Sequence, residues 1–418
     1  MKNKILTGLL LVLIGGWGSL SAQNVGSNYA RQVNTLIGTK GVGLTSGYLY
    51  PGATYPYGMV QFTPSYFSKR SGFVINQLSG GGCEHMGNFP TFPVKGKLKM
   101  SPDNILNYRI NISEEKGHAG YYEAKVQEDI HAKLTVTERT GMASYEYPAD
   151  QQYGTVIIGG GISATPIDQA AIVITAPNKC EGYAEGGNFC GLRTPYKVYF
   201  VAEFDTDALE SGTWKRDELK PNATFAEGEY SGVYFTFDVN KKKNIQYKIG
   251  VSYVSVENAK ENLKAENSGW NFAQIQNQAE TKWNHYLGMI EVEGTNPDRT
   301  TQFYTHLYRS FVHPNVCSDV NGEYMGADFR VHKSRSKHYT SFSNWDTYRT
   351  QIQLLAMLDP EVTSDIVISH QLFAEQSGGS FPRWVMANIE TGVMQGDPSS
   401  ILVSNAYAFG ARNYDPKP

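Results

Sequence analysis

Cysteine is scarce in this sequence of 418 residues, and its four copies form no metal-binding pattern. None of their spacings resembles a zinc site. Cys180 and Cys190 flank a glycine-rich loop and could form a disulfide, although spacing alone does not fix the connectivity. Cys83 and Cys317 are too far apart in the sequence to argue for or against a bond. The cysteines therefore indicate at most a disulfide in an exported protein.

Charge of one sign is also missing. The formal net charge is −3, and the basic residues form no stripe. The run Lys241-Lys242-Lys243 stands between two strand-like segments and is typical of a solvated turn. We therefore expect no nucleic-acid partner. The sequence also lacks a repeat regular enough for a solenoid, and its triple glycine is not set in the strand–GxxxxGK[ST]–helix arrangement of a phosphate-binding loop.

An apolar run occurs at the N-terminus, but it is too short for a membrane-spanning helix. Lys2 and Lys4 precede the run, which extends from Ile5 to Ile14, and Ser19-Leu20-Ser21-Ala22 resembles a cleavage region. We interpret residues 1–22 as a secretory signal peptide. No cysteine follows it directly, which argues against a lipid anchor. We expect an exported protein, periplasmic or secreted, with no stable membrane anchor.

Residues 23–256 are predicted to form an antiparallel β-sandwich. Apolar and polar residues alternate with a period of two in several segments separated by turn residues, which indicates strands with one buried face. These segments are residues 122–126, 132–136, 143–147, 198–204, 233–239 and 247–253. Their irregular spacing leaves room for long functional loops.

From about residue 257 the hydrophobic period becomes that of helices. Phe272, Ile275, Ala279 and Trp283 fall on one helical face, and a short strand-like segment follows at 290–292. We interpret residues 257–296 as a helical linker. Further helices are expected around 303–311, 345–358, 361–376 and 397–410. Residues 297–418 would then form a mostly helical domain with aromatic-rich loops.

The segment Ser343–Arg349 concentrates an indole, a carboxylate, a phenol and a guanidinium at the start of a predicted helix. An aromatic ring can lie under a sugar, while Asp346 and Arg349 can hydrogen-bond its hydroxyls. A plainer interpretation is also open, because Ser343 and Asp346 have the spacing of a capping box and Trp345 could belong to the core.

Two glycine-rich loops have a similar ambiguity. They lie at 50–60 and 78–85. Glycine allows backbone conformations that other residues resist and lets a ligand approach the chain. Both loops could instead be tight turns at the rim of the sandwich.

Seven short motifs occur in a fixed order over roughly residues 33–410. They are Ile37-Gly38-Thr39, Pro51–Thr54 with Pro56–Val60, Leu78-Ser79-Gly80 with Gly82-Cys83, Phe303-Tyr304-Thr305 with Leu307-Tyr308, Trp345–Arg349, Pro382-Arg383-Trp384, and Gly396-Asp397-Pro398. Each is weak alone. In this order they resemble glycoside hydrolase family 92, the calcium-dependent exo-α-mannosidases.

The resemblance implies a β-sandwich, a helical linker and an (α/α)6 barrel, with the active site between sandwich and barrel. It places Asp346 and Arg349 near the terminal mannose. The substrate-binding candidates are Trp345, Asp346, Arg349, Arg383, Trp384, Glu390 and Asp397, and the cleft loop of the sandwich is Gly80, Gly81, Gly82 and Cys83. The implied substrate is a mannose-containing glycan, such as an N-glycan or a mannan. The implied cofactor of the complete enzyme is Ca²⁺, a hard ion that can hold sugar hydroxyls.

The family inverts configuration, with an acid and a base carboxyl group about 6.5–9.5 Å apart. In family members this pair and most calcium ligands lie beyond the point that matches Pro418. Only about four of the twelve barrel helices are expected within 297–418. We therefore expect the catalytic acid and base beyond Pro418, the start of an incomplete barrel in this chain, and no mannosidase activity from this chain alone.

The sequence also departs from the family pattern. Residues 73–77 replace a histidine-rich run, and Gly81 stands where members often have threonine. Ile389 and Gly392 replace a usual glycine and asparagine. These differences fall on the leaving-group subsite, which sets linkage preference.

Two other functions stay open from the sequence. The chain could be a non-catalytic carbohydrate-binding protein. It could also be a different (α/α)6 enzyme, such as a sugar phosphorylase or a glucoamylase-like hydrolase, although the Trp345–Arg349 motif argues against this.

Overall fold

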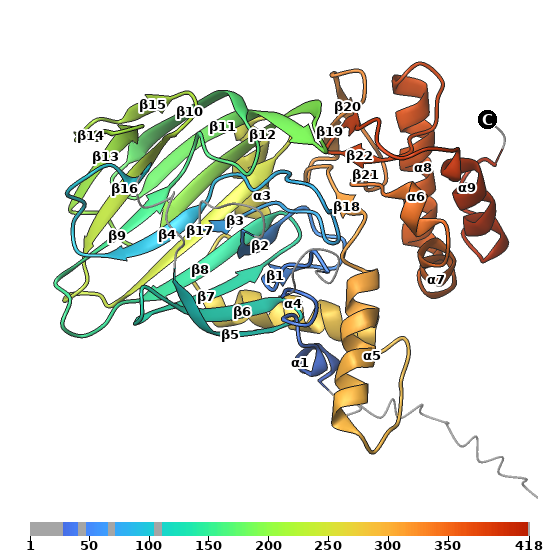
Figure 1. Cartoon of the computed structure of the whole chain (residues 1–418), viewed down its shortest axis with the longest axis horizontal. Coiled ribbons are helices and arrows are strands. Elements are labelled where there is room, and N and C mark those ends of the chain that lie inside the picture. Colours follow the sequence, from blue (N-terminus) through green and yellow to red (C-terminus); the bar gives the residue numbers. More distant parts are fainter. Residues whose placement is uncertain (1–27, 41–46, 66–71, 104–110, 417–418) are drawn as a thin grey trace, which may run out of the picture.

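The computed structural model describes residues 28–40, 47–65, 72–103 and 111–416. The predicted signal peptide at 1–22 lies outside them. Two stacked β-sheets form one side of the molecule and a group of helices forms the other (Figure 1). This confirms the predicted antiparallel sandwich followed by a helical part. None of the helices in the described ranges is both long and apolar enough to cross a membrane.

Within the described residues, the first sheet of the sandwich has eight strands in the order β1-β2-β3-β4-β9-β16-β13-β14. Their bounds are β1 Ala53–Thr54, β2 Gln61–Pro64, β3 Phe73–Val74, β4 Thr91–Lys95, β9 Tyr153–Ile158, β13 Glu210–Lys215, β14 Glu218–Pro221 and β16 Ser231–Asp238. The second sheet runs β15-β10-β11-β12-β17-β8-β7-β6-β5. Its strands are β5 Ile112–His118, β6 Tyr121–Val126, β7 Ile130–Val136, β8 Thr140–Glu146, β10 Ile167–Ala176, β11 Lys179–Phe189, β12 Leu192–Phe204, β15 Phe225–Glu227 and β17 Asn244–Ser252.

The alternation in the sequence becomes the burial pattern of the strands. In β6 and β11, buried residues alternate with half-buried ones. The buried faces of both sheets supply one core, which includes the Phe73, Tyr145 and Phe204 rings. The long pair β11–β12 ends in a hairpin where Phe189 lies opposite Leu192. This hairpin reaches toward the helical part (Figure 1).

Helices α3 (Val256–Glu266) and α4 (Phe272–Leu287) connect the sandwich to the helical part. Helix α3 packs on β17 and β12, and α4 packs on β7 and on the N-terminal helix α1 (Tyr29–Gln32). The strand predicted at 290–292 is wrong, because these residues form no strand.

The helical part contains α5 (Pro297–Ser310), α6 (Asn344–Thr347), α7 (Gln351–Leu358), α8 (Pro360–Gln376) and α9 (Pro398–Ala408). Three small strand pairs accompany them: β18 Asn315–Val316 with β21 Tyr339–Thr340, β19 Glu323–Met325 with β20 Val331–Lys333, and β22 Val385–Met386 with β23 Ile389–Glu390. The single helix predicted over 345–358 is wrong, since a turn at 348–350 separates α6 from α7.

A second apolar core joins α1, α4 and the helical part. Leu307, Phe311 and Leu355 are buried in it, although only the start of a barrel was expected in this chain. The exposed apolar side chains of this region are others, among them Met357, Ile401, Tyr407 and Phe409.

The disulfide differs from the pairing that the sequence suggested. Cys190 is bonded to Cys83 and not to Cys180. Cys180 and Cys317 are free and buried. Cys180 points into the sandwich core from β11, whereas Cys190 stands at the hairpin tip, so the two cannot meet.

Candidate functional site

A cavity of about 350 Å³ lies between a sandwich loop and the helical part. The sandwich contributes Leu78, Ser79 and Gly80. The other lining residues are Arg309, His313, Pro314, Ser341, Phe342, Ser343, Asn344, Asp346, Thr347, Gln351, Ile352, Leu355, Ile366, His370, Trp384 and Leu402. Of the predicted site residues, the cavity therefore brings together Gly80, Asp346 and Trp384.

Asp346 lies in the short helix α6 and is exposed. Its carboxylate accepts a hydrogen bond from the Ser343 hydroxyl. The Ser343 side chain accepts no backbone N–H, so the capping box allowed by the sequence is not formed. Ser343 instead orients the Asp346 carboxylate at the cavity wall.

Trp345 and Arg349 do not line this cavity. The Arg349 guanidinium lies 4.9 Å from the Trp345 ring centroid and 5.0 Å from that of Tyr348. Such cation–π contacts orient a guanidinium without neutralising it. Arg349 is exposed, and the motif therefore presents two groups on different surfaces, Asp346 to the cavity and Arg349 to solvent.

Trp384 forms part of the cavity wall that the helical part supplies, and its backbone holds the Trp345–Arg349 motif in place. Ser343 and Trp384 form an antiparallel bridge, and Val385 N–H donates to Phe342 O at 2.8 Å. The Asn344 amide donates to Pro382 O at 2.9 Å. The two motifs around residues 345 and 383 thus fold as one unit.

The sandwich loop is fixed by a buried histidine. Leu78 N–H donates to His85 Nε2 at 2.8 Å, and His85 Nδ1 donates to Cys83 O at 2.6 Å. Since the Leu78 amide can only donate, the ring is neutral with its proton on Nδ1. Burial lowers the pKa of His85 from 6.5 to about 4.

Two glycines of the loop are required by this geometry. Gly80 has φ +83°, a left-handed conformation that favours glycine. A Cβ on Gly81 would lie 2.9 Å from the His85 ring. His85 therefore occupies the space that a side chain at position 81 would need, which accounts physically for glycine where threonine was the expected residue.

The remaining candidates gather around a second depression of about 470 Å³, lined by Arg383, Glu390 and Asp397 together with 379–382, 396 and 398. The Glu390 carboxylate accepts from the backbone N–H groups of Arg383 at 2.7 Å and Trp384 at 3.2 Å. Arg383 Nε donates to Val393 O at 2.9 Å. Asp397 accepts from Ser400 at 3.2 Å. Glu390 and Arg383 are thus engaged in holding the 383–393 loop.

Several cavity residues were not predicted. Arg309 donates to Tyr50 O and Thr35 O, and its buried Nε has no partner within the described ranges. His313 Nε2 accepts from Ser79 N–H at 2.7 Å. His370 is buried on α8 among Ile366, Val367 and Phe373. A single histidine on an otherwise apolar helical face is the feature of the sequence that could have predicted it.

The cavity has few charged groups among its described lining residues. Asp346 is the one carboxylate among its described lining residues, and Arg309 is the one permanent cation. Burial lowers the pKa of both His313 and His370 to about 4, so these rings are neutral at pH 7. The cavity therefore offers hydroxyl, amide and carboxylate groups beside the Trp384 ring, a mixture suited to a neutral polyhydroxylated ligand.

The described residues do not offer a ready calcium site. Within 28–40, 47–65, 72–103 and 111–416, no three His, Cys, Asp or Glu side chains are grouped so that they could hold a metal ion. Calcium takes six to eight oxygen ligands, usually with several carboxylates, and the cavity supplies one.

Comparison with known families gives two adjacent matches. Residues 32–252 match the family model described as the glycosyl hydrolase family 92 N-terminal domain. Residues 258–417 match the model described as the glycosyl hydrolase family 92 catalytic domain. The two matches together extend over most of the chain.

Individual relatives are longer than this chain. An uncharacterized secreted glycosidase of Arthroderma benhamiae is 26% identical over 387 residues, which are 82% of this chain and 48% of that protein. A family GH92 α-mannosidase from Bacteroides thetaiotaomicron superposes with a TM-score of 0.85 at 24% identity, covering 93% of this chain and 55% of the other. A family GH92 inverting mannosidase from the same organism gives 0.80 at 26% identity, covering 93% and 54%. The chain thus spans about half the length of these relatives.

Proposed function

Since the chain belongs to glycosyl hydrolase family 92, we propose that its cavity binds the terminal mannose of an α-mannoside, as part of an exo-acting, inverting α-mannosidase. The observation that carries the proposal is the position of Asp346. Its carboxylate stands in the cavity between the sandwich loop and Trp384, and Ser343 orients it. A carboxylate accepts hydrogen bonds from two neighbouring sugar hydroxyls, and the indole offers an apolar surface to the sugar ring.

The geometry of the cavity suits sugar binding, but hydrolysis has a further requirement. Inversion needs two carboxyl groups about 6.5–9.5 Å apart, one on each side of the scissile bond. Among the described residues that line the cavity, Asp346 is the single one with a carboxyl group. We therefore propose that Asp346 binds substrate, and that the described residues by themselves form a sugar-binding site without an acid–base pair. This observation also favours the second candidate, a carbohydrate-binding protein that does not cleave.

Calcium remains part of the proposal for the complete enzyme only. The donor groups of the described residues do not fit the ion. We also propose that the protein is exported.

Two observations support export. The Arthroderma benhamiae relative is described as secreted, and the Cys83–Cys190 bond is of the kind that persists in oxidising compartments.

Titration calorimetry with methyl α-mannoside, beside its C2 epimer methyl α-glucoside, tests the binding proposal. We expect the mannoside to bind the more tightly. Equal binding of the two sugars, or none, would remove the assignment to mannose. A parallel assay of aryl α-mannoside hydrolysis with and without Ca²⁺ should show no turnover by this chain. Turnover would instead mean that an acid–base pair lies within this chain.

A further inference from the structure

Three aromatic rings from three separate segments meet beside the cavity, one pair stacked and the other tilted. Phe189, at the end of β11, lies between His85 of the sandwich loop and Trp384 of the helical part. The ring centroids of Phe189 and Trp384 are 4.5 Å apart with 25° between their planes, and those of Phe189 and His85 are 5.9 Å apart. Phe189 is 3% exposed and does not itself line the cavity.

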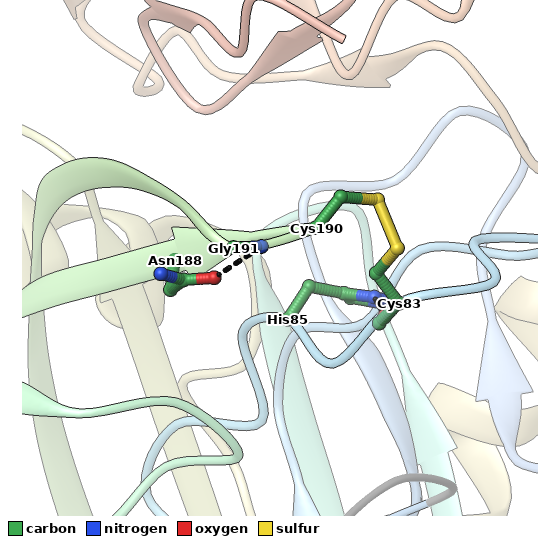
Figure 2. The surroundings of a disulfide bond; sticks show 5 residues. All are labelled: Cys83, His85, Asn188, Cys190 and Gly191. Atoms are coloured by element: carbon green, nitrogen blue, oxygen red, sulfur yellow. Dashed lines mark hydrogen bonds between the residues drawn. A yellow bond between two sulfur atoms is a disulfide. The ribbon is translucent and has the colours of Figure 1, made fainter.

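The hairpin tip that carries Phe189 is fixed on both sides. The next residue, Cys190, is bonded to Cys83 of the sandwich loop (Figure 2). Asn188 Oδ1 accepts from Gly191 N–H at 3.0 Å and closes the turn. The backbone that carries the Phe189 ring is therefore tied to the sandwich loop.

Both neighbours of Phe189 lead directly to the cavity. His85 accepts the N–H of Leu78, and Leu78 is a lining residue. Trp384 lines the cavity itself and pairs with Ser343, the residue that orients Asp346. Phe189 thus contacts one residue of each wall. His85 holds the sandwich wall through Leu78, and Trp384 holds the helical wall through Ser343.

We propose that Phe189, held by the Cys83–Cys190 disulfide, is a positioning residue that fixes the two walls of the cavity at their spacing before ligand enters. The inference rests on the proposed binding of α-mannosides in this cavity. A wall ordered in advance removes the cost of ordering it during binding, so affinity depends on Phe189 although it does not touch the ligand.

The test uses the chain with Phe189→Ala, Phe189→Leu or the pair Cys83→Ala/Cys190→Ala. Phe225→Ala is the matched control, because Phe225 is a sandwich phenylalanine on edge strand β15 and is 53% exposed. Hydrogen exchange without ligand, read on peptides covering 78–85 and 383–386, reports the walls directly. Calorimetry with methyl α-mannoside reports affinity.

We expect Phe189→Ala and the double cysteine variant to speed exchange in both peptides and to weaken binding by about tenfold. Phe189→Leu should fall between them and the wild type, and Phe225→Ala should match the wild type. Unchanged exchange in the folded Phe189 variants would overturn the proposal, as would an equal effect of Phe225→Ala. If the wild type binds no mannoside while exchange still responds to Phe189, the positioning role stands and the proposed function fails.

Discussion

His313 Nε2 accepts a hydrogen bond of 2.7 Å from the Ser79 N–H, which joins the helical part to the sandwich loop. The amide can only donate, so the ring is neutral and its Nδ1 proton is donated to Asn315 Oδ1 at 2.6 Å. The Asn315 amide in turn donates to Gly58 O at 2.8 Å. One wall of the cavity therefore depends on a histidine that must stay uncharged.

This relationship predicts acid sensitivity. Burial lowers the pKa of His313 from 6.5 to about 4, whereas the unfolded chain keeps the ordinary value. Between pH 6.5 and about 4 the unfolded state therefore binds the extra proton, and stability falls as the pH falls through this window. At 1.36 kcal/mol per pKa unit, His313 accounts for about 3 kcal/mol of that loss. Urea unfolding from pH 7.5 to 4 measures it.

The matched comparison is His313→Gln against His306→Gln, which changes an exposed histidine of α5. We expect His313→Gln to lower stability at pH 7 and to make the pH dependence shallower by about this amount, because one of the buried histidines whose pKa is lowered is gone while His85 and His370 remain. His306→Gln should leave the curve unchanged. An unchanged slope in His313→Gln would mean that the ring is not held neutral.

The sandwich could be predicted from the sequence because one face of each strand is buried. Buried and half-buried residues alternate along β6 and over much of β12, and the period of two is then visible. The split between α6 and α7 could not be predicted by periodicity. No proline or glycine marks the turn at 348–350, so the sequence carries no local signal for the break.

The site was predictable only in part, for a similar reason. The Trp345–Arg349 motif led to Asp346, and the motif around Trp384 led to its partner strand. Arg309 and His370 come from helices α5 and α8, and His313 comes from the loop between α5 and β18, so the three meet only through folding. The disulfide was missed because Cys83 and Cys190 are 107 residues apart, a separation at which sequence carries no pairing signal.

The disulfide leads to a prediction about stability. Closing a loop of 107 residues restricts the unfolded chain, which in the chain-entropy model is worth about 4–5 kcal/mol. We expect Cys83→Ala/Cys190→Ala to lose most of this amount in guanidinium unfolding. The wild type in excess dithiothreitol should approach the midpoint of the double variant. A double variant as stable as the wild type would show that the cross-link does not form in solution.

Arg139 provides a second stability test, at the boundary between sandwich and helical part. Its guanidinium donates to Glu138 at 2.6 Å, to Glu266 at 2.7 Å and to Ser318 O at 2.7 Å, and its side chain is 7% exposed. Arg139→Met takes this partner from the largely buried Glu138 and Glu266 carboxylates, which should cost about 3–5 kcal/mol.

The control for Arg139 is Arg193→Met. Arg193 pairs with Asp168 but is 71% exposed, so its loss should cost less than about 1 kcal/mol. Urea midpoints of the two variants at equal salt make the comparison. Similar losses in both would contradict a special role for the buried cluster.

Asp346 can be tested so that binding and helix capping give opposite results. A capping residue contributes about 0.5–2 kcal/mol to stability, but Ser343 accepts no backbone N–H and the Asp346 carboxylate faces the cavity. We therefore expect Asp346→Ala to change the free energy of unfolding by less than about 0.5 kcal/mol. Loss of a charge-assisted hydrogen bond should weaken methyl α-mannoside binding by about 1.5–3 kcal/mol. Asp346→Asn keeps the shape of the side chain and loses its charge, so its affinity should lie between those of the wild type and Asp346→Ala. Lower stability with unchanged affinity would assign Asp346 to the structure of α6 and would leave the cavity without its central binding group.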